Sequence, residues 1–306
     1  VTKECTTKLK GAGVIPIGVA TQYTVDEEGN RSIKRRTIHD ASFPPPSGKS
    51  INARLDKDTL EPCYYGFCLL RLLHLIHMMR HTNPTIAILI MKIDLDSAYR
   101  RLHVLVKMAL LAITVIKRIA YILMRLPFGV ANGPGDYGII SETIFDLTND
   151  LLQDETWDPE TTKSPLATNI DKPKTNHTND TPFGSARKLY VPVPAIKAGT
   201  DGYIDDIVTV MLDIDDWVQR GVNAALLAVF TIFRPHTTTD PLPRSDATSI
   251  RKLKGEGTPD EKKIVLGWQI NTRKFKIYLP KLKSIDWINE IRKVIHANKV
   301  TTSTLE

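Results

Sequence analysis

The chain has 306 residues, which is enough for one large domain or for two or three subdomains that each bury a core. Its 42% hydrophobic and 25% charged residues are ordinary for a soluble globular protein. Three cysteines, Cys5, Cys63 and Cys68, are too few and wrongly spaced for a disulfide framework or a zinc site. The formal net charge of +7 favours an anionic partner such as nucleic acid, but only weakly.

Neither a signal peptide nor a membrane span is expected. The opening VTKECTTKLK lacks an apolar core, and the most apolar helical run, FCLLRLLHLIHMM, is too short and is interrupted by Arg71, His74 and His77. His74, His77 and His81 share a helical face, but without an acidic or cysteine partner they do not predict a metal site. We expect an intracellular protein without membrane partners, in either cytoplasm or nucleus.

The first half of the chain alternates short strands with helices. Residues 14–55 combine the strand-like GVIPIGVATQYTV with a basic turn, NRSIKRR, and a proline-rich loop, SFPPPSGKSIN. Apolar residues at helical spacing predict a helix over 60–81, and TIAILIMKIDL predicts a strand that ends near Asp94. LLAITVI and IAYILMRL predict a strand pair, and IISETIFDLTNDLLQ predicts a helix.

The second half begins with a change of composition. Residues 152–198 are polar, and from Asp146 to Asp180 eight acidic residues stand against three lysines, a local net charge of −5. We expect a flexible inserted loop without a nucleic-acid contact. A strand in YIDDIVTVML, a helix in WVQRGVNAALLAVFTIF, a polar loop over 235–248 and paired strands in KKIVLGWQIN and KFKIYLP follow. Ser284 is a candidate N-cap for a last helix.

Two adjacent carboxylates, Asp205 and Asp206, stand in an otherwise apolar run. Buried charges of one sign cost several kcal/mol unless they are neutralised. One interpretation places both at a solvated hairpin tip. The other uses Asp94, at the end of a second apolar strand, to complete a set of oxygen ligands for Mg²⁺. Two such ions can activate a hydroxyl and stabilise a leaving phosphate oxygen, as nucleotidyl transfer requires.

Two basic groups are candidates for binding phosphate. Lys34, Arg35 and Arg36 could hold a triphosphate, or could form a solvated turn. A second group near the C-terminus could contact a duplex backbone, or could face solvent on a two-sided sheet. It comprises Arg273, Lys274, Lys276, Lys281 and Lys283.

In this order, the motifs resemble those of retroelement reverse transcriptases, of the LTR and tyrosine-recombinase retrotransposon type. The resemblance covers residues 30–295 and rests on five segments. They are RRTIHDASF with the later Asn52, KIDLDSAY, LPFGVANGP, YIDD, and VLGWQI followed by YLPKLK. A lone YxDD is a weak signal, whereas four further motifs in the right order make coincidence improbable.

The resemblance implies a role for each matching residue. Asp94, Asp205 and Asp206 would form the catalytic cluster on two Mg²⁺ ions, for which Mn²⁺ could substitute, with help from the Leu95 carbonyl. The incoming dNTP would meet Arg36, Tyr99, Phe128 and Gly129, and Pro134 and Tyr137 would shape the following helix. Primer and template contacts would come from Tyr203, Gly267, Trp268, Arg273, Lys274 and Lys276. Asp40 and Asn52 would complete the first motif.

Tyr99 bears on the choice of substrate. It lies five residues after Asp94, where a ring fills the space that a ribose 2′-hydroxyl would need, so deoxynucleotides are favoured. Related RNA polymerases usually place Asp there and Gly before the acidic pair, where this chain has Tyr203. The alternative is a ring simply packed in the core.

The implied fold is α+β, a right-hand polymerase with an antiparallel palm sheet backed by helices. Fingers are expected over 1–84 and 106–125, palm over 85–105, 126–151 and 199–282, the insertion over 152–198, and the start of the thumb over 283–306. Implied partners are a primed RNA or DNA template, dNTP, and ribonuclease H and integrase or recombinase regions of the same element.

One feature departs from the family pattern, and one residue of that pattern has several candidate positions. The connection before YIDD is unusually long, and the family's late lysine could be Lys252, Lys254 or Lys262. Two alternatives to the enzyme stay open. One is a non-catalytic RNA-binding scaffold with the same fold, and the other is a decayed copy of a mobile element.

Overall fold

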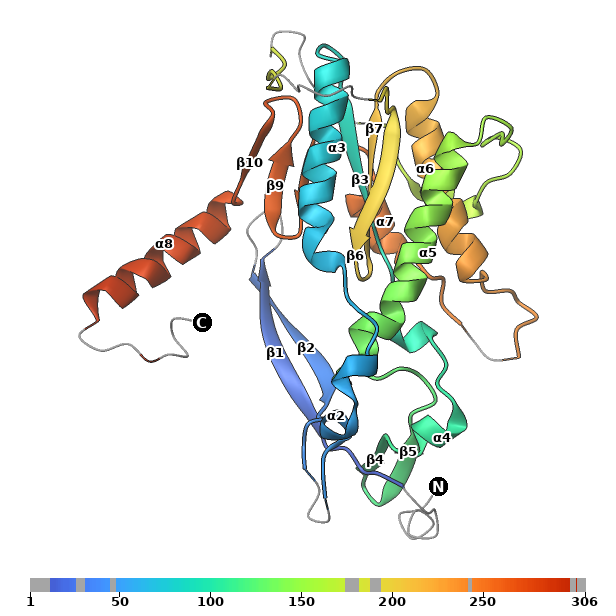
Figure 1. Cartoon of the computed structure of the whole chain (residues 1–306), viewed down its shortest axis with the longest axis vertical. Coiled ribbons are helices and arrows are strands. Elements are labelled where there is room, and N and C mark those ends of the chain that lie inside the picture. Colours follow the sequence, from blue (N-terminus) through green and yellow to red (C-terminus); the bar gives the residue numbers. More distant parts are fainter. Residues whose placement is uncertain are drawn as a thin grey trace.

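A computed structural model describes the chain (Figure 1). The described residues are 12–25, 31–44, 48–173, 182–187, 194–241, 244–297 and 301. Helices and strands are mixed along the chain, so the expected α+β composition is confirmed. In the part of the chain that the structure describes, no helix combines the length and apolarity needed to cross a bilayer.

The centre of the molecule is a three-stranded antiparallel sheet in the order β3-β7-β6. Its strands are β3 (Ile88–Asp94), β6 (Ala198–Tyr203) and β7 (Asp206–Leu212). Helix α3 (Cys68–Thr82) covers one face, while α5 (Gly133–Gln153) and α6 (Trp217–Ile232) cover the other (Figure 1).

The alternation of side chains along the strands explains this sandwich. Leu89, Met91 and Ile93 pack towards α5 and α6, whereas Ile88 and Ile90 pack towards α3. Successive side chains of a strand point to opposite faces. Because both faces are covered, residues 86–91 are apolar without alternation, and the first polar side chain of β3 is Lys92.

Smaller strand pairs lie at one end of this sandwich (Figure 1). β1 (Ile17–Val25) pairs with β2 (Arg31–His39), and β4 (Ile113–Ile116) pairs with β5 (Ile119–Ile122), as LLAITVI and IAYILMRL predicted. The basic turn expected at NRSIKRR is wrong from residue 31 onward, because that segment pairs with β1. Short helices complete this region: α2 (Ile51–Arg54), α4 (Val106–Ala109), and the 3₁₀ turns η1 (Lys57–Thr59), η2 (Tyr65–Phe67) and η3 (Ala98–Arg101).

A second three-stranded sheet follows α7 (Ile250–Glu256) in the order β10-β9-β8. KKIVLGWQIN is itself a hairpin, β8 (Lys262–Val265) and β9 (Trp268–Asn271), because Leu266 and Gly267 both take positive φ and turn the chain. β10 (Lys276–Tyr278) pairs with β9 as expected.

The last helix, α8 (Lys281–His296), projects from the body and buries none of its residues (Figure 1). It begins directly after Pro280, so Ser284 lies inside the helix and the predicted N-cap is wrong. The fixed φ of proline suits the residue that leads into a helix, which accounts for the earlier start.

The insertion is ordered over its first part, contrary to the flexible loop expected for 152–198. η4 (Pro165–Asn169) buries Leu166, and Arg220 of α6 donates to the carbonyls of Leu152 and Trp157 at 3.3 and 3.1 Å. These contacts hold the segment against α6. The other expectations for residues 174–181 and 188–193 lie outside the described residues.

Candidate active site at one end of the central sheet

Three carboxylates meet where the central sheet ends. Asp94 is the last residue of β3, Asp206 is the first of β7, and the register places them directly opposite each other. Asp205 lies between β6 and β7 at the tip of the hairpin. Its backbone carbonyl accepts a hydrogen bond from the Leu95 N–H at 3.0 Å, which joins the hairpin to the end of β3.

The tip of the β6–β7 hairpin is a strained turn that a hydrogen bond from α5 stabilises. Ile204 has φ 56°, a left-handed conformation that costs a β-branched residue about 1–3 kcal/mol. Its carbonyl accepts a 2.6 Å hydrogen bond from Ser141 Oγ, and Ser141 is buried in α5. A non-glycine residue keeps such a conformation when contacts with neighbouring elements stabilise it. Here the contact with α5 does so. The turn therefore displays Asp205 in a fixed position.

Two lysines neutralise most of this negative charge. Lys252 Nζ lies 2.6 Å from Asp94 Oδ2, and Lys92 Nζ lies 3.2 Å from Asp206 Oδ1. Lys92 also pairs with Glu256 of α7 at 3.4 Å. Asp205 forms no ion pair with any described residue. Among Lys252, Lys254 and Lys262, the three candidates for the family's late lysine, Lys252 is therefore the one that lies at the acidic cluster.

The electrostatics of the pair at the hairpin follow from burial. Burial raises the pKa of Asp205 above its ordinary value, and the neighbouring Asp206 and Asp94 raise it further. Burial also raises the pKa of Asp206, although Lys92 opposes that shift. Asp205 is thus a carboxylate whose charge is poorly compensated, the condition in which an added cation is stabilising.

The donor chemistry fits a hard divalent cation. Carboxylate and carbonyl oxygens are what Mg²⁺ binds, and Asp94, Asp205, Asp206 and Leu95 supply them at one sheet end. Within the described ranges, however, no group of three or more His, Cys, Asp or Glu side chains already stands at ligand spacing. Asp94 and Asp206 are turned to their lysines instead. His77, from the histidine face of α3, contacts the Arg187 carbonyl at 3.2 Å.

An aromatic group lies beside the sheet end. The Tyr99 ring centroid is 4.8 Å from that of Phe128 and 5.2 Å from that of Tyr137. Tyr99 is 8% exposed, so its edge reaches the surface only slightly, while Phe128 is 42% exposed. The Tyr137 hydroxyl is buried and has no hydrogen-bond partner among the described residues.

The loop that carries Phe128 is fixed by two residues of the motifs. Gly129 has φ 103°, and a Cβ there would lie 2.0 Å from the His39 carbonyl oxygen, so only glycine fits. Asn52 Nδ2 donates to the Gly129 carbonyl, and Asn52 Oδ1 accepts from the Ala131 N–H, both at 2.9 Å. Asp40 accepts a hydrogen bond from the Ser42 N–H at 3.1 Å. Asn52 therefore orders this loop.

The remaining candidate residues lie farther out. Arg36 is exposed on β2, paired with Ala20, and forms no ion pair within the described part of the chain. Gly267 has φ 80° and Trp268 is half-buried after it. Tyr203 stacks at a tilt on Tyr65, with ring centroids 5.6 Å apart.

Of the five basic residues near the C-terminus, Lys281 and Lys283 lie in α8, and the other three lie on β10 or in the turn before it. Lys274 and Lys276 are exposed, as a backbone contact would need. Arg273 Nε pairs instead with the buried Glu261 Oε2 at 2.8 Å, and its guanidinium lies 4.1 Å from the Phe183 ring. Arg273 thus contacts protein, which neither sequence interpretation of this group foresaw.

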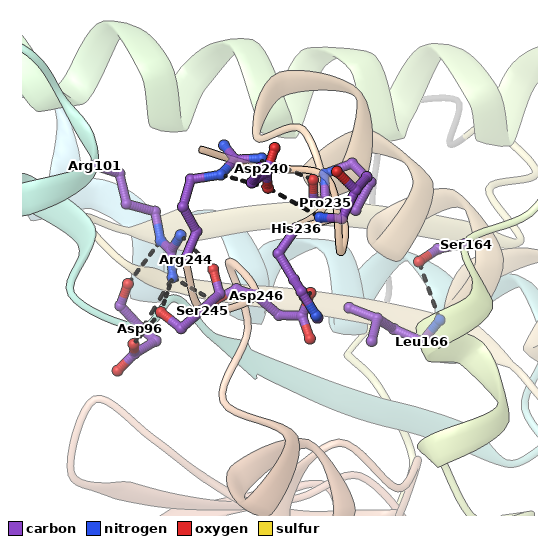
Figure 2. A network of polar contacts seen from close by, with 11 residues as sticks. Asp96, Arg101, Ser164, Leu166, Pro235, His236, Asp240, Arg244, Ser245 and Asp246 are labelled. Atoms are coloured by element: carbon purple, nitrogen blue, oxygen red, sulfur yellow. Dashed lines mark hydrogen bonds and ion pairs between the residues drawn. The ribbon is translucent and has the colours of Figure 1, made fainter. Parts of the chain in front are cut away.

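A polar network orders the loop that leads to Lys252 (Figure 2). In Figure 2, Arg101 points to the loop and to Asp96, whose carbonyl it contacts at 2.8 Å, and it also reaches the Ser245 carbonyl at 3.2 Å. Asp240 accepts from Arg244 at 2.9 Å and also from Arg234, and hydrogen bonds from the Thr237 N–H, Arg244 and Arg234 lower its pKa. These contacts hold the described parts of the polar loop expected at 235–248, residues 235–241 and 244–248, against the body.

No protein-family model matches the chain, and no curated protein matches it. Among solved structures, it is similar to the foamy viral protease–reverse transcriptase dRH in complex with double-stranded DNA. The two share 13% identity over 94% of this chain, with a TM-score of 0.45, and the chain spans about a third (34%) of that protein.

Proposed function

We propose that this chain is the RNA-directed DNA polymerase of a retrotransposon, of the LTR or tyrosine-recombinase type, built as fingers, palm and the start of a thumb. The observation that carries the proposal is the pairing of Asp94 with Asp206 at the end of the sheet, with Asp205 beside them at the hairpin tip. The motif order that resembles reverse transcriptases supports it.

Asp94, Asp205 and Asp206, with the Leu95 carbonyl, would hold two Mg²⁺ ions, and Mn²⁺ could replace them. When bound, such ions activate the primer 3′-hydroxyl and stabilise the departing pyrophosphate. The resident lysines would have to release Asp94 and Asp206. Lys252, once free of Asp94, remains next to the site as a cation for phosphate.

The surrounding residues would position the substrates. Tyr99, packed on Phe128, would exclude a 2′-hydroxyl and so favour dNTP, while Gly129 lets the backbone approach the nucleotide. Arg36 on β2 would bind the triphosphate. Gly267 and Trp268 would contact the primer end, and the exposed Lys274 and Lys276 would contact the backbone of the primed template.

A second candidate function is a non-catalytic RNA-binding scaffold with the same fold. The ion pairs Lys252–Asp94 and Lys92–Asp206 favour it, since they neutralise two of the three carboxylates without any metal. Such a protein would bind a duplex and incorporate nothing.

Primer extension separates the two functions. The assay uses oligo(dT) on poly(rA) with dTTP and Mg²⁺, and compares the protein with Asp205→Asn and with the matched control Asp213→Asn. Asp213 is exposed after the far end of β7. Extension by the protein and by the control, but not by Asp205→Asn, supports the polymerase. Duplex binding by a folded protein with no extension supports the scaffold.

A further inference from the structure

A short piece of the insertion, residues 182–187, docks beside the β8–β10 sheet, and we name it the strap. The Phe183 ring lies between two guanidinium groups, with Arg80 Cζ 4.6 Å and Arg273 Cζ 4.1 Å from its centroid. Arginine stacked on an aromatic face is a specific and stabilising contact. The strap therefore joins α3, which carries Arg80, to the turn between β9 and β10, which carries Arg273.

The backbone of the strap makes two more contacts. The Gly184 N–H donates to the Arg273 carbonyl at 2.6 Å, and a Cβ on Gly184 would lie 2.5 Å from the Lys274 carbonyl oxygen. Only glycine allows so close an approach between the strap and the β9–β10 turn. Farther on, His77 Nε2 lies 3.2 Å from the Arg187 carbonyl oxygen, and the His77 ring packs edge-on against Phe275.

Both arginines are themselves rigidly held. Arg80 is 1% exposed and donates to the Ile86 carbonyl at 2.7 Å and to the Thr272 carbonyl at 3.3 Å. Arg273 pairs with Glu261, which is also 1% exposed. The β9–β10 turn is thus joined to the protein core through Thr272, and the Phe183 ring adds a second connection between Arg80 and Arg273.

The β8–β10 sheet is also held by Thr272, whose Oγ1 donates to the Ile88 carbonyl at 2.6 Å, and by Lys283, whose Nζ donates to the Gly267 carbonyl at 3.5 Å, while its outer strand is open. β10 is exposed at all three of its residues. The turn at Gly267, at the other end of β9, carries the residues that the proposed function assigns to the primer end. A short hairpin opens and moves as one unit. Contacts at the β9–β10 turn therefore affect the position of the Gly267 turn at the other end of β9.

We propose that the strap is a positioning element that fixes the β8–β10 sheet through Phe183 and thereby sets the place of Gly267 and Trp268. The expected effect of the strap on primer binding rests on the proposed function, whereas its effect on the sheet does not. Phe183 acts through Arg80 and Arg273 and touches no substrate.

The test compares Phe183→Leu, which keeps an apolar side chain but loses the π face, with Phe183→Tyr, which keeps both. In Phe183→Leu, amides of residues 268–278 exchange with solvent about tenfold faster, as expected when two cation–π contacts are lost. Its Kd for an oligo(dT)·poly(rA) duplex rises about fivefold, while the incorporation rate at saturating duplex is unchanged. Phe183→Tyr restores both the exchange rates and the Kd.

Equal exchange in the Leu variant and the unsubstituted protein would overturn the proposal, and so would faster exchange with an unchanged Kd. Faster exchange over the whole chain would show general destabilisation and would also overturn it. If the unsubstituted protein binds no duplex, the proposed function fails, and the exchange measurement still decides whether Phe183 fixes the sheet.

Discussion

Lys252 places its ammonium group 2.6 Å from a carboxylate oxygen of Asp94, across the space where the end of β3 meets α7. This ion pair joins α7 to the end of the central sheet. Since Lys92 likewise pairs with Asp206, the carboxylates that would bind metal are held by lysines in this structure, and only Asp205 lacks an ion-pair partner among the described residues.

Replacing Lys252 by Met should tighten the binding of Mn²⁺. A partly exposed ion pair is worth up to about 1 kcal/mol, so the Kd measured by isothermal titration should fall about fivefold. Lys254→Met is the matched control, because Lys254 lies exposed on the same helix and should leave the Kd unchanged. Weaker binding by Lys252→Met would show that the lysine supports the metal site and does not compete with the ion.

Replacing Asp205 by Asn should stabilise the protein at pH 7. The folded-state pKa of Asp205 is raised, by burial first and by Asp206 next, so its ionised form destabilises the fold. Each unit of such a shift is worth about 1.4 kcal/mol. The wild-type protein is least penalised below the unfolded-state pKa and loses stability as pH rises from the unfolded-state to the folded-state pKa, so the advantage of Asn should be larger at neutral than at acidic pH and should vanish below about pH 4.

Thermal melts of both proteins from pH 4 to pH 8 would show this dependence. An advantage of Asn that grew on acidification would contradict the assignment of burial as its cause.

Replacing Tyr99 by Val should relax the choice of sugar. Removing the ring opens space beside Phe128, and the incorporation of UTP relative to dTTP should rise about 10- to 100-fold, the range that steric discrimination of 1–3 kcal/mol provides. Tyr121→Val, on exposed β5, serves as the control. Single-nucleotide incorporation measures the ratio, and an unchanged ratio would leave Tyr99 as a packed core residue.

Replacing Arg220 by Met should unfold the first part of the insertion. Arg220 is largely buried, donates to the carbonyls of Leu151 and Trp157, and stacks on the Trp157 ring at 5.0 Å. Hydrogen bonds from a charged donor contribute about 1.5–3 kcal/mol each, so the free energy of unfolding should fall by about 3 kcal/mol.

Chemical denaturation would measure that loss. Arg251→Met, at an exposed position of α7, should change stability by less than about 0.5 kcal/mol. A similar loss in both variants would argue against the role of Arg220.

Two of the three strands of the central sheet, β3 and β7, could be predicted from the sequence because their signal is local, whereas β6, AGTDGY, has no apolar run and is not predicted. Both predicted strands are apolar runs of strand length, TIAILIMKIDL and YIDDIVTVML, with carboxylates at one end. A carboxylate is costly next to a buried run, which makes Asp94 and Asp205 candidate functional residues. The pairing of Asp94 with Asp206 is a matter of register, which depends on packing between distant segments and not on either run alone.

The lysine partners of the carboxylates are less apparent from the sequence. Lys92 stands two residues before Asp94, so both share a face of β3, and a lysine inside an apolar strand needs an anion as much as Asp94 needs a cation. This complementary pair of charges is a signal that the sequence itself contains. Lys252 lies on a seven-residue helix with too little periodicity to be predicted, and its contact with Asp94 is purely tertiary.

The insertion could not be predicted because its order comes from elsewhere in the chain. Polar composition correctly indicates that it cannot form its own core. What orders residues 154–173 is Arg220 in α6, and what orders residues 182–187 is Arg80 in α3 with Arg273 in the β9–β10 turn. None of these partners is recognisable from the insertion itself.

The most direct test of the central claim, that these carboxylates form a metal site for nucleotidyl transfer, is a titration of Mn²⁺ followed by electron paramagnetic resonance, with primed template and dTTP present. We predict two bound ions for the protein and for Asp213→Asn, and fewer than two for Asp205→Asn. Equal binding by all three proteins, or none by any, would contradict the account.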